Sequence, residues 1–261
     1  MRKDLIKRYG IILPRPDHLS ARTLKITPEL SADGASIRHA ELLCTFKNGE
    51  AKIPIKIIEA LSSEPVSTVI LLSPSSEVPT RYFPLDELCH KGVRVIQICA
   101  EKVLASARRQ GSLRSLFSGK RLVSGTSLIS FSVMRAAEYA ASLEGADLSK
   151  ITAMAHGSLC EAVVLAAISS DTITHVALSS PLCELDGSLY TKSAKALSPD
   201  EQTELFIELL DECQKKILIS CVRYENEKVE IYPHATINLR DGYPSATRQD
   251  WLFFIEKLSE G

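Results

Sequence analysis

The sequence lacks the short motifs that mark several large classes of enzyme and binding protein. It has no Walker phosphate-binding loop, no GxGxxG dinucleotide fingerprint and no CxxC pair. Aromatic residues make up only 6% of the chain, and 31 basic residues are balanced by 32 acidic ones. Such a composition gives no overall field toward nucleic acid and few rings for base stacking. We therefore expect no cofactor and no nucleic-acid partner.

Long hydrophobic runs and paired cysteines are also missing. No uncharged segment reaches the ~20 residues of a membrane-spanning helix, and the N-terminal MRKDLIKRYG is charged throughout, unlike a signal peptide. The seven cysteines are an odd number and stand in apolar runs such as VIQIC and LISCV. Reduced core thiols explain them better than disulfides do. We expect a cytoplasmic protein that does not contact a membrane.

The 261 residues, 45% hydrophobic and 24% charged, are typical of a globular protein. There is no internal repeat and no low-complexity linker, so the sequence predicts one domain over residues 1–261. Residues 1–23 form an N-terminal arm, because the two prolines of PRPDHLS favour extended backbone. Residues 36–46 and 51–58 then flank an Asn-Gly pair, a strong hairpin signal.

After residue 60 short, wholly apolar runs alternate with helical segments. Continuous apolar runs are typical of parallel strands buried on both faces. The pattern predicts a three-layer αβα fold of the α/β class, with a mostly parallel central sheet and an antiparallel N-terminal hairpin. Ligands of such sheets bind beyond the carboxyl ends of the strands. The predicted strands are residues 68–73, 93–99, 151–155, 176–179 and 216–222, and the predicted helices are 85–90, 127–143, 161–168, 199–215 and 246–258.

From Val66 to Leu258 the order and spacing of these segments resemble the α/β-hydrolase superfamily, and within it the acetyl-xylan-esterase-like and dienelactone-hydrolase-like proteins. HKGVRVIQI resembles a strand of that fold, and GTSLISFSVMRAAEYAASLEGADLSKITAMAHGSLCEAVVLAAI resembles its long helix and nucleophile elbow. KVEIYPHATINLRDGYPSATRQDWLFFIEKL resembles the last strand, the histidine loop and the closing helix. The resemblance implies a hydrolase fold, and in active members a nucleophile, a histidine and an acid.

The residues at the implied elbow do not match an active enzyme. The pattern Gly-x-Ser-x-Gly falls on residues 155–159, so that Gly157 takes the position of the nucleophile and Leu159 replaces a glycine. Glycine has no side chain and cannot act as a nucleophile. One interpretation is a plain strand-to-helix turn capped by Ser158. The other is a shift of register that makes Ser158 the nucleophile.

The remaining catalytic positions implied by the resemblance also depart from it. The family's histidine falls near Ile237, three residues after His234. Its acid follows the seventh strand of the sheet, on a crossover to the next parallel strand that needs a dozen or more residues. Because only six residues separate ILISCV from KVEIYP, we expect a hairpin or one bent strand there, with Glu225 and Glu227 in a solvated turn. The segment LLSPSSEVPTRYFP has no glycine for an oxyanion site and contains three prolines, which supply no N–H donor.

Two further groups of residues are candidates for a site. His156 and Cys160 are four apart and could share a helix face, but two ligands without a third are a weak zinc signal, so we expect no metal. Residues 102–121 carry six basic side chains, either a solvated loop or a contact surface for an anionic ligand or acidic partner. These side chains are Lys102, Arg108, Arg109, Arg114, Lys120 and Arg121.

Two hypotheses follow. In the first, the protein is a member of the superfamily that has lost hydrolytic activity and acts as a binding or interaction module for a small molecule or a protein. In the second, it is an ester hydrolase that uses Ser158 as nucleophile. The base would then be His156 or His234, and the orienting acid Glu225, Glu227 or Asp186. The sequence favours the first and indicates neither the ligand nor the oligomeric state.

Overall fold

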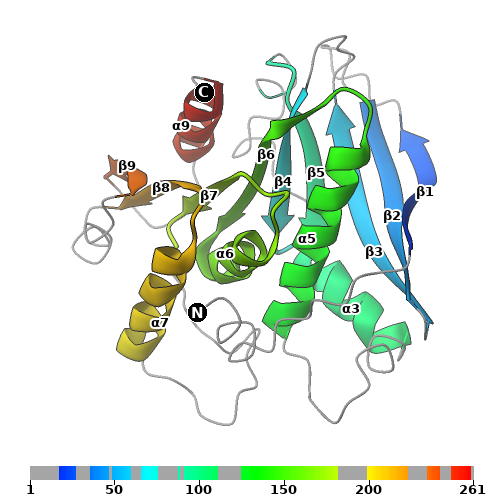
Figure 1. Ribbon diagram of the computed structural model, residues 1–261, viewed down its shortest axis with the longest axis horizontal. Helices are drawn as coiled ribbons and strands as arrows, with labels where there is room; N and C mark the ends of the chain where they lie inside the picture. The colour runs from blue at the N-terminus through cyan, green and yellow to red at the C-terminus, as the bar shows by residue number, and fades with distance from the viewer. Residues whose placement is uncertain are drawn as a thin grey trace.

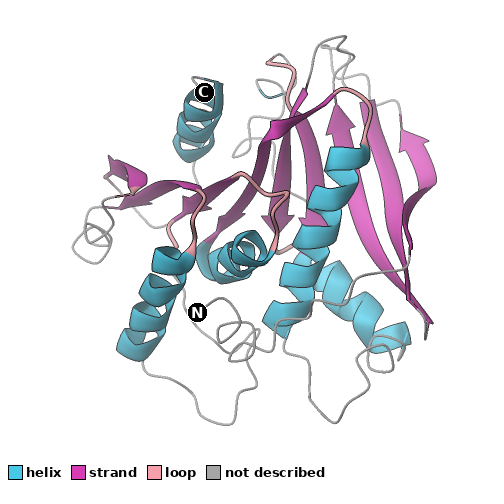
Figure 2. Cartoon of the chain, in the orientation of Figure 1, coloured by secondary structure: helices cyan, strands magenta, loops and turns pink. Residues whose placement is uncertain are grey.

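The computed structural model describes residues 18–27, 36–46, 49–59, 66–75, 88, 91–110, 125–181, 199–222, 234–241 and 248–259. Within these ranges nine strands form one sheet in the order β1-β2-β3-β5-β4-β6-β7-β8-β9, which runs across the whole molecule in Figure 2. The strands are β1 (His18–Thr27), β2 (Ser36–Phe46), β3 (Gly49–Glu59), β4 (Val66–Ser73), β5 (Arg94–Cys99), β6 (Ala146–His156), β7 (His175–Ser179), β8 (Lys216–Val222) and β9 (Ala235–Arg240).

The sheet has an antiparallel start and a parallel remainder, which confirms the predicted fold class. β1, β2, β3 and β5 pair antiparallel in that order, and the pairs from β5 through β4, β6, β7 and β8 to β9 are all parallel. β4, β5 and β8 are almost wholly buried, as their continuous apolar runs require. β1 begins at His18, so paired sheet takes in the last residues of the segment expected as an N-terminal arm.

Helices cover both faces of the sheet and complete three layers. α3 (Ala100–Gln110), α5 (Gly125–Ser142), α6 (Cys160–Ser169) and α7 (Pro199–Glu212) contribute to one hydrophobic cluster with one face of the strands. α9 (Arg248–Ser259) packs Trp251, Phe254 and Ile255 against the other face. In Figure 1 α9 lies apart from the group formed by α3, α5, α6 and α7.

Small side chains let the central helices approach closely. α5 is buried along most of its length, and Ser130, which is fully buried, donates a hydrogen bond to the carbonyl of Ala162 on α6 at 2.9 Å. α6 itself carries mostly Ala, Val and Leu and is buried on nearly all sides. A helix that is apolar all round belongs in a core. This packing fixes the start of α6 against the end of β6, where the elbow lies.

Two predictions about loops are corrected by the structure. β9 is parallel to β8, and the connection runs from Val222 to Ala235, so the crossover that the sequence was expected to lack is present. It is long enough because β9 begins at Ala235. The earlier KVEIYP, expected as the last strand, lies entirely outside the described residues. Ile237, expected in a loop, therefore lies inside β9. We refer to residues 102–121 as the basic stretch. Its first half is not a loop as expected, because it lies in α3.

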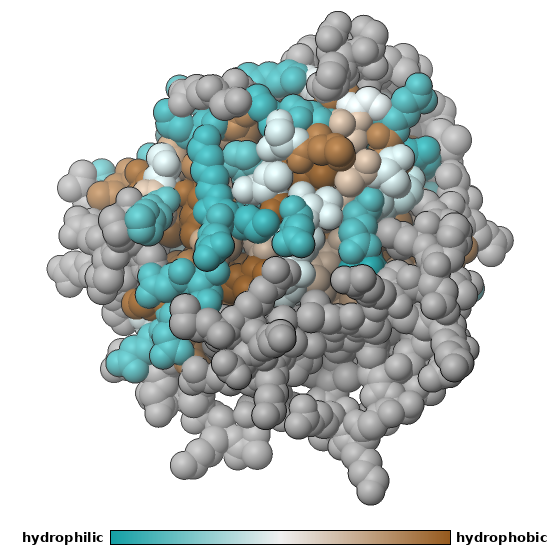
Figure 3. Space-filling view, in the orientation of Figure 1, coloured by the Kyte–Doolittle hydropathy of each residue, from teal (hydrophilic) through white to brown (hydrophobic). Residues whose placement is uncertain are grey.

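The described surface and thiols have ordinary features. Of the helices that the structure describes, none is both long and apolar enough to cross a bilayer. In Figure 3 hydrophilic and hydrophobic residues are interspersed over the described part of the face shown. The cysteines in the described ranges are all buried and in no disulfide: Cys44, Cys99, Cys160, Cys213 and Cys221.

Candidate functional site

The carboxyl ends of β6, β7, β8 and β9 meet at one edge of the sheet, the carboxyl edge, where ligands of open α/β sheets bind. β6 ends at His156, and a 3₁₀ turn at Gly157–Leu159 leads directly into α6. This strand–turn–helix lies next to β4 and β7, inside the sheet. The elbow predicted from the sequence is therefore present, at the predicted residues and in the predicted place.

Gly157 has the backbone conformation that an elbow demands of its central residue. Its φ is 59°, in the left-handed region that glycine enters without penalty. Leu159, at a position where the family has glycine, is buried in the core on the side of α6. The structure thus places Gly157 at the tip of the turn, and the tip carries no side chain.

Ser158 lies one residue further along the turn and is partly buried. It is not a helix cap as expected, because the residues before the 3₁₀ turn and before α6 are His156 and Leu159, and neither cap position has a side-chain hydrogen bond. Within the described ranges Ser158 has no hydrogen-bond partner. Its hydroxyl is therefore not activated by any described base, although His156 is close in the chain.

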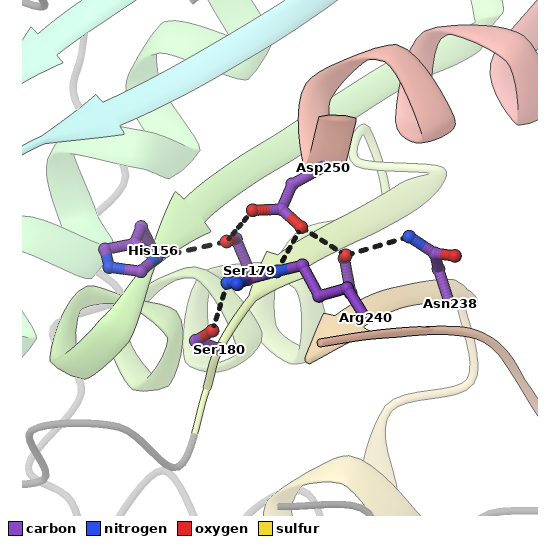
Figure 4. A network of polar contacts seen from close by, with 7 residues as sticks. His156, Ser179, Ser180, Asn238, Arg240 and Asp250 are labelled. Atoms are coloured by element: carbon purple, nitrogen blue, oxygen red, sulfur yellow. Dashed lines mark hydrogen bonds and ion pairs between the residues drawn. The ribbon is translucent and has the colours of Figure 1, made fainter. Parts of the chain in front are cut away.

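His156 is held by a chain of hydrogen bonds that leads away from Ser158. Its Nδ1 lies 3.1 Å from Ser179 Oγ, and Ser179 donates to Asp250 Oδ2 at 3.2 Å. The only proton of the Ser179 hydroxyl is used toward the carboxylate, so that oxygen must accept from His156. The proton of a neutral His156 is therefore on Nδ1. Figure 4 shows the histidine directed at Ser179 from the end of β6.

Asp250 is the centre of this polar cluster and is completely buried. Arg240 Nε donates to Asp250 Oδ1 at 2.8 Å, and Ser220 Oγ forms a short hydrogen bond to the same oxygen. Asn238 Nδ2 in turn donates to Ser220 Oγ at 3.2 Å. These side chains come from β7, β8, β9 and the first turn of α9 and converge in Figure 4. They tie the start of α9 to the ends of three strands.

The same cluster stabilises a strained residue. Ser180 has φ of 44°, which costs a non-glycine residue about 1–2 kcal/mol. Its N–H donates to the Ser220 carbonyl at 2.7 Å, and its Oγ accepts from Arg240 Nη2 at 3.0 Å. The side chains of Arg240 and Asp250 are 6% and 0% exposed, and a buried ion pair is tolerated only with such additional hydrogen bonds. We refer to Ser179, Ser180, Ser220, Asn238, Arg240 and Asp250 as the Asp250 cluster.

The other catalytic candidates are not brought together with Ser158. His234 is exposed and immediately precedes β9, so it lies at the amino edge, opposite the elbow. Glu225, Glu227 and Asp186 lie outside the described residues. Cys160 Sγ is 3.8 Å from the Ser179 carbonyl. No group of three or more His, Cys, Asp or Glu side chains in the described ranges is placed to hold a metal.

Glu161 is a titratable group that the sequence did not single out. It stands in the first turn of α6, three residues after Ser158, and burial raises the pKa of its carboxyl to about 7. No hydrogen bond or ion pair reaches it from the described part of the chain. A carboxyl in this state can exchange a proton near neutral pH. It could serve as an acid or a base at the elbow only for a group that reaches the start of α6.

The Asp250 cluster was also missed by the sequence. Its residues are far apart in the chain and of types that are common on surfaces. Two signals could have indicated it: Asp250 stands one residue before the buried face of the last helix, and Arg240 ends the strand that precedes it. Both signals can be recognised only if Ala235–Arg240 is identified as the last strand.

Comparison of the sequence with protein-family models and with curated proteins finds no match. Solved structures do match. A glucuronoyl esterase from Solibacter usitatus has a TM-score of 0.72 at 11% identity over 99% of this chain and 91% of that one. A glucuronoyl esterase from Teredinibacter turnerae gives 0.72 at 12% identity over 99% and 83%. An acetyl xylan esterase from Paenibacillus sp. R4 gives 0.64 at 12% identity over 99% and 92%.

At this level of identity the likeness concerns the fold alone. The chain has the α/β-hydrolase fold over almost its full length, and the resemblance seen in the sequence is confirmed at that level.

Proposed function

We propose that this protein is a non-hydrolytic member of the α/β-hydrolase fold that binds a small molecule or a protein partner at the carboxyl edge. The observation that carries the proposal is Gly157, which has a φ of 59° at the tip of the elbow. Nucleophilic catalysis in this fold needs a side chain at that point, exposed above the sheet. Here the turn is kept and the side chain is missing.

The position of the histidine supports the same conclusion. With β9 ending at Arg240 and α9 beginning at Arg248, the loop that carries the histidine in similar enzymes corresponds to residues 241–247. Their sequence, DGYPSAT, contains no histidine. The region between the ends of β8 and β9 and the start of α9 is instead held by the Arg240–Asp250 ion pair. Its polar groups bond to one another, which fits a structural role.

The basic stretch gives the proposed module a contact surface. α3 begins directly after the last residue of β5, so residues 102–110 leave the carboxyl edge, and Lys102 is exposed. Clustered positive charge beside a ligand site attracts anionic ligands or acidic partners.

A carboxylic ester hydrolase is the second candidate, because specific observations favour it. The structural neighbours are esterases, Ser158 is partly accessible beside His156, and the crossover after β8 exists. In similar enzymes that crossover carries the acid, and Glu225 and Glu227 fall on it in the sequence.

Ester hydrolysis separates the two candidates. Purified wild type should hydrolyse p-nitrophenyl acetate no faster than Ser158→Ala does, because a serine without a base in reach stays a protonated, weak nucleophile. Gly157→Ser, which restores a hydroxyl at the tip, should gain no activity because no histidine stands in the loop at 241–247.

Labelling by a fluorophosphonate gives an independent readout of the same question. We expect no label on Ser158 in the folded protein. Labelling that is lost on heat unfolding and in Ser158→Ala, together with faster ester turnover by wild type, would replace the binding module with the esterase.

A further inference from the structure

A second concave site lies at the amino edge of the sheet, on the side covered by α9. It is a cavity of about 220 Å³, formed where β4, the turn before β5, and β6 face the last turns of α9. Ile255 and Leu258 of α9 close one wall, and Val69 and Val93 form part of the apolar floor. The elbow is at the opposite end of β6, and Asp250 is in the first turn of α9, whereas Ile255 and Leu258 are in its later turns. This cavity is therefore separate from the carboxyl edge.

Two lysines give the cavity a positive rim. Lys91 and Lys150 both line it, the first exposed and the second partly buried. In the described part of the chain neither forms an ion pair or a hydrogen bond. The Asp147 carboxylate accepts from Ser149 at 2.6 Å and forms no described ion pair with either lysine. Unpaired ammonium groups beside a cavity favour an anion.

Neighbouring titrating groups respond to the same positive potential. His175, the first residue of β7, has its pKa lowered by burial and then by the charges of Lys216 and Lys150. Lys150 also contributes to lowering the pKa of Asp147, mainly held down by its hydrogen bond to Ser149. The amino edge around the cavity is thus a place where negative charge is stabilised.

A hydroxyl inside the cavity has no partner. Thr152 lines the site and is only 1% exposed, and no residue that the structure describes forms a hydrogen bond with its side chain. It lies two residues before Met154, on the face of β6 that packs against α9. A buried hydroxyl without a partner costs free energy, and a ligand acceptor would satisfy it. Ser67 adds a second hydroxyl to the lining.

We propose that this cavity binds a small amphipathic anion, with a carboxylate or phosphate between Lys91, Lys150 and the Thr152 hydroxyl and a short apolar chain against Val69, Ile255 and Leu258. The volume is below the ~300–1,000 Å³ of pockets for drug-sized ligands, which limits the chain to a few carbons. The head group is recognised by charge and by one hydrogen bond, and the chain by the apolar floor.

Isothermal titration calorimetry of the full chain tests the site with hexanoate and hexyl phosphate as probes. Hexan-1-ol and hexylammonium are the controls for the apolar chain alone and for the wrong charge. We expect saturable binding of at least one anion, and binding of both controls at least tenfold weaker. Affinity should fall as salt rises, because exposed lysines are screened over about 8–10 Å.

Three variants locate the binding. Lys91→Gln/Lys150→Gln should weaken anion binding at least tenfold, and Thr152→Val, which keeps the shape and removes the hydroxyl, should weaken it severalfold. Lys52→Gln removes a partly exposed lysine of β3, which lies outside the cavity and outside residues 102–121, and should change affinity less than twofold. Circular dichroism and urea unfolding show that each variant is folded.

The proposal is overturned if neither anion binds, if hexan-1-ol binds as well as hexanoate, or if the double lysine variant keeps its affinity. A head-group preference between the two anions assigns carboxylate or phosphate chemistry. Because the cavity is at the amino edge, ester hydrolysis at Ser158 would leave this result unchanged. The two proposals therefore fail independently.

Discussion

The two edges of the parallel sheet differ in how their polar groups are satisfied. At the carboxyl edge Asp250 accepts from Arg240, Ser179 and Ser220, and every one of these side chains is buried. At the amino edge Lys91 and Lys150 border a cavity without a described partner. The carboxyl edge is where ligands of this fold are expected, yet its charges are used within the protein.

A polar cluster in the expected place is therefore not by itself evidence of a site. Buried polar groups that satisfy one another rigidify a fold, whereas buried groups without partners call for an explanation. By this criterion the Asp250 cluster is a structural clamp for α9 and not itself a ligand site, and the amino-edge cavity is a candidate for a second ligand, separate from the one proposed at the carboxyl edge. The following experiments test that contrast, beginning with the largest effect.

Asp250→Ala should lower the free energy of unfolding by about 3–5 kcal/mol, because it leaves Arg240 as a buried, uncompensated charge. Urea unfolding followed by circular dichroism measures the loss. Arg38→Gln is the control, since it breaks an ion pair with Glu59 whose side chains are 29% and 26% exposed and leaves Glu59 paired with Arg94. Such partly exposed pairs contribute about 0–1 kcal/mol.

A double variant distinguishes a clamp from a functional pair. Arg240→Met/Asp250→Leu removes both charges and should be more stable than Asp250→Ala, because replacing a whole buried pair with apolar residues is often neutral. If Asp250→Ala costs less than about 1 kcal/mol but abolishes ligand binding at the carboxyl edge, the cluster is a site and the contrast between the edges fails.

Glu161 differs from the Asp250 cluster because it has no described partner at the carboxyl edge. Substituting it should change the free energy of unfolding by an intermediate amount. Burial raises its pKa from 4.5 to about 7, so the unfolded chain loses this proton at lower pH than the folded one. Its contribution to stability is complete below pH 4.5 and is lost as pH rises to about 7. Glu161→Gln should remove this loss and stabilise the protein by about 1–2 kcal/mol above pH 7.

The measurement is the free energy of unfolding from pH 4.5 to 8, compared between wild type and variant. Glu101→Gln is the matched control, because Glu101 is also a first-turn acid, of α3, and is exposed. Both changes remove a charge at a helix N-terminus, so the difference isolates burial. If the free energy of unfolding depends on pH in the same way in both variants, Glu161 is solvated in the folded protein. It would then be no exception to the carboxyl edge, where the buried polar groups have partners.

The fold could be predicted from the sequence because its signals are local. Buried parallel strands need continuous apolar runs, and the run at Lys216–Val222 was predicted with the bounds that the structure has. The elbow was also local: Gly157 follows directly from the strand before it. The antiparallel start was given by Asn48-Gly49 between two alternating segments.

The last strand and the polar cluster could not be predicted in the same way. Ala235–Arg240 is made of partly buried and exposed residues and one buried residue, Arg240, because it is the last strand of the described sheet. The more apolar KVEIYP looks more like a strand in the sequence. As a result, the predicted crossover was too short, and the predicted histidine loop was placed too early in the chain. The Asp250 cluster depends on contacts between residues up to 71 positions apart, and no local pattern records such contacts.

The smallest predicted effect concerns His175, which reports the potential of the amino edge. Its pKa is lowered by burial and by Lys216 and Lys150, so protonation is disfavoured in the folded state and stability is lost as pH falls below the unfolded value. Lys150→Gln should raise the pKa of His175 slightly, as measured by NMR titration of the imidazole. Lys102→Gln, at the other edge, should leave it unchanged. Saturating hexanoate should shift the pKa in the same direction as Lys150→Gln, because a bound anion offsets the lysine charge. A titration that is insensitive to both would mean that the lysines are fully screened by solvent, and the positive rim would then have no basis.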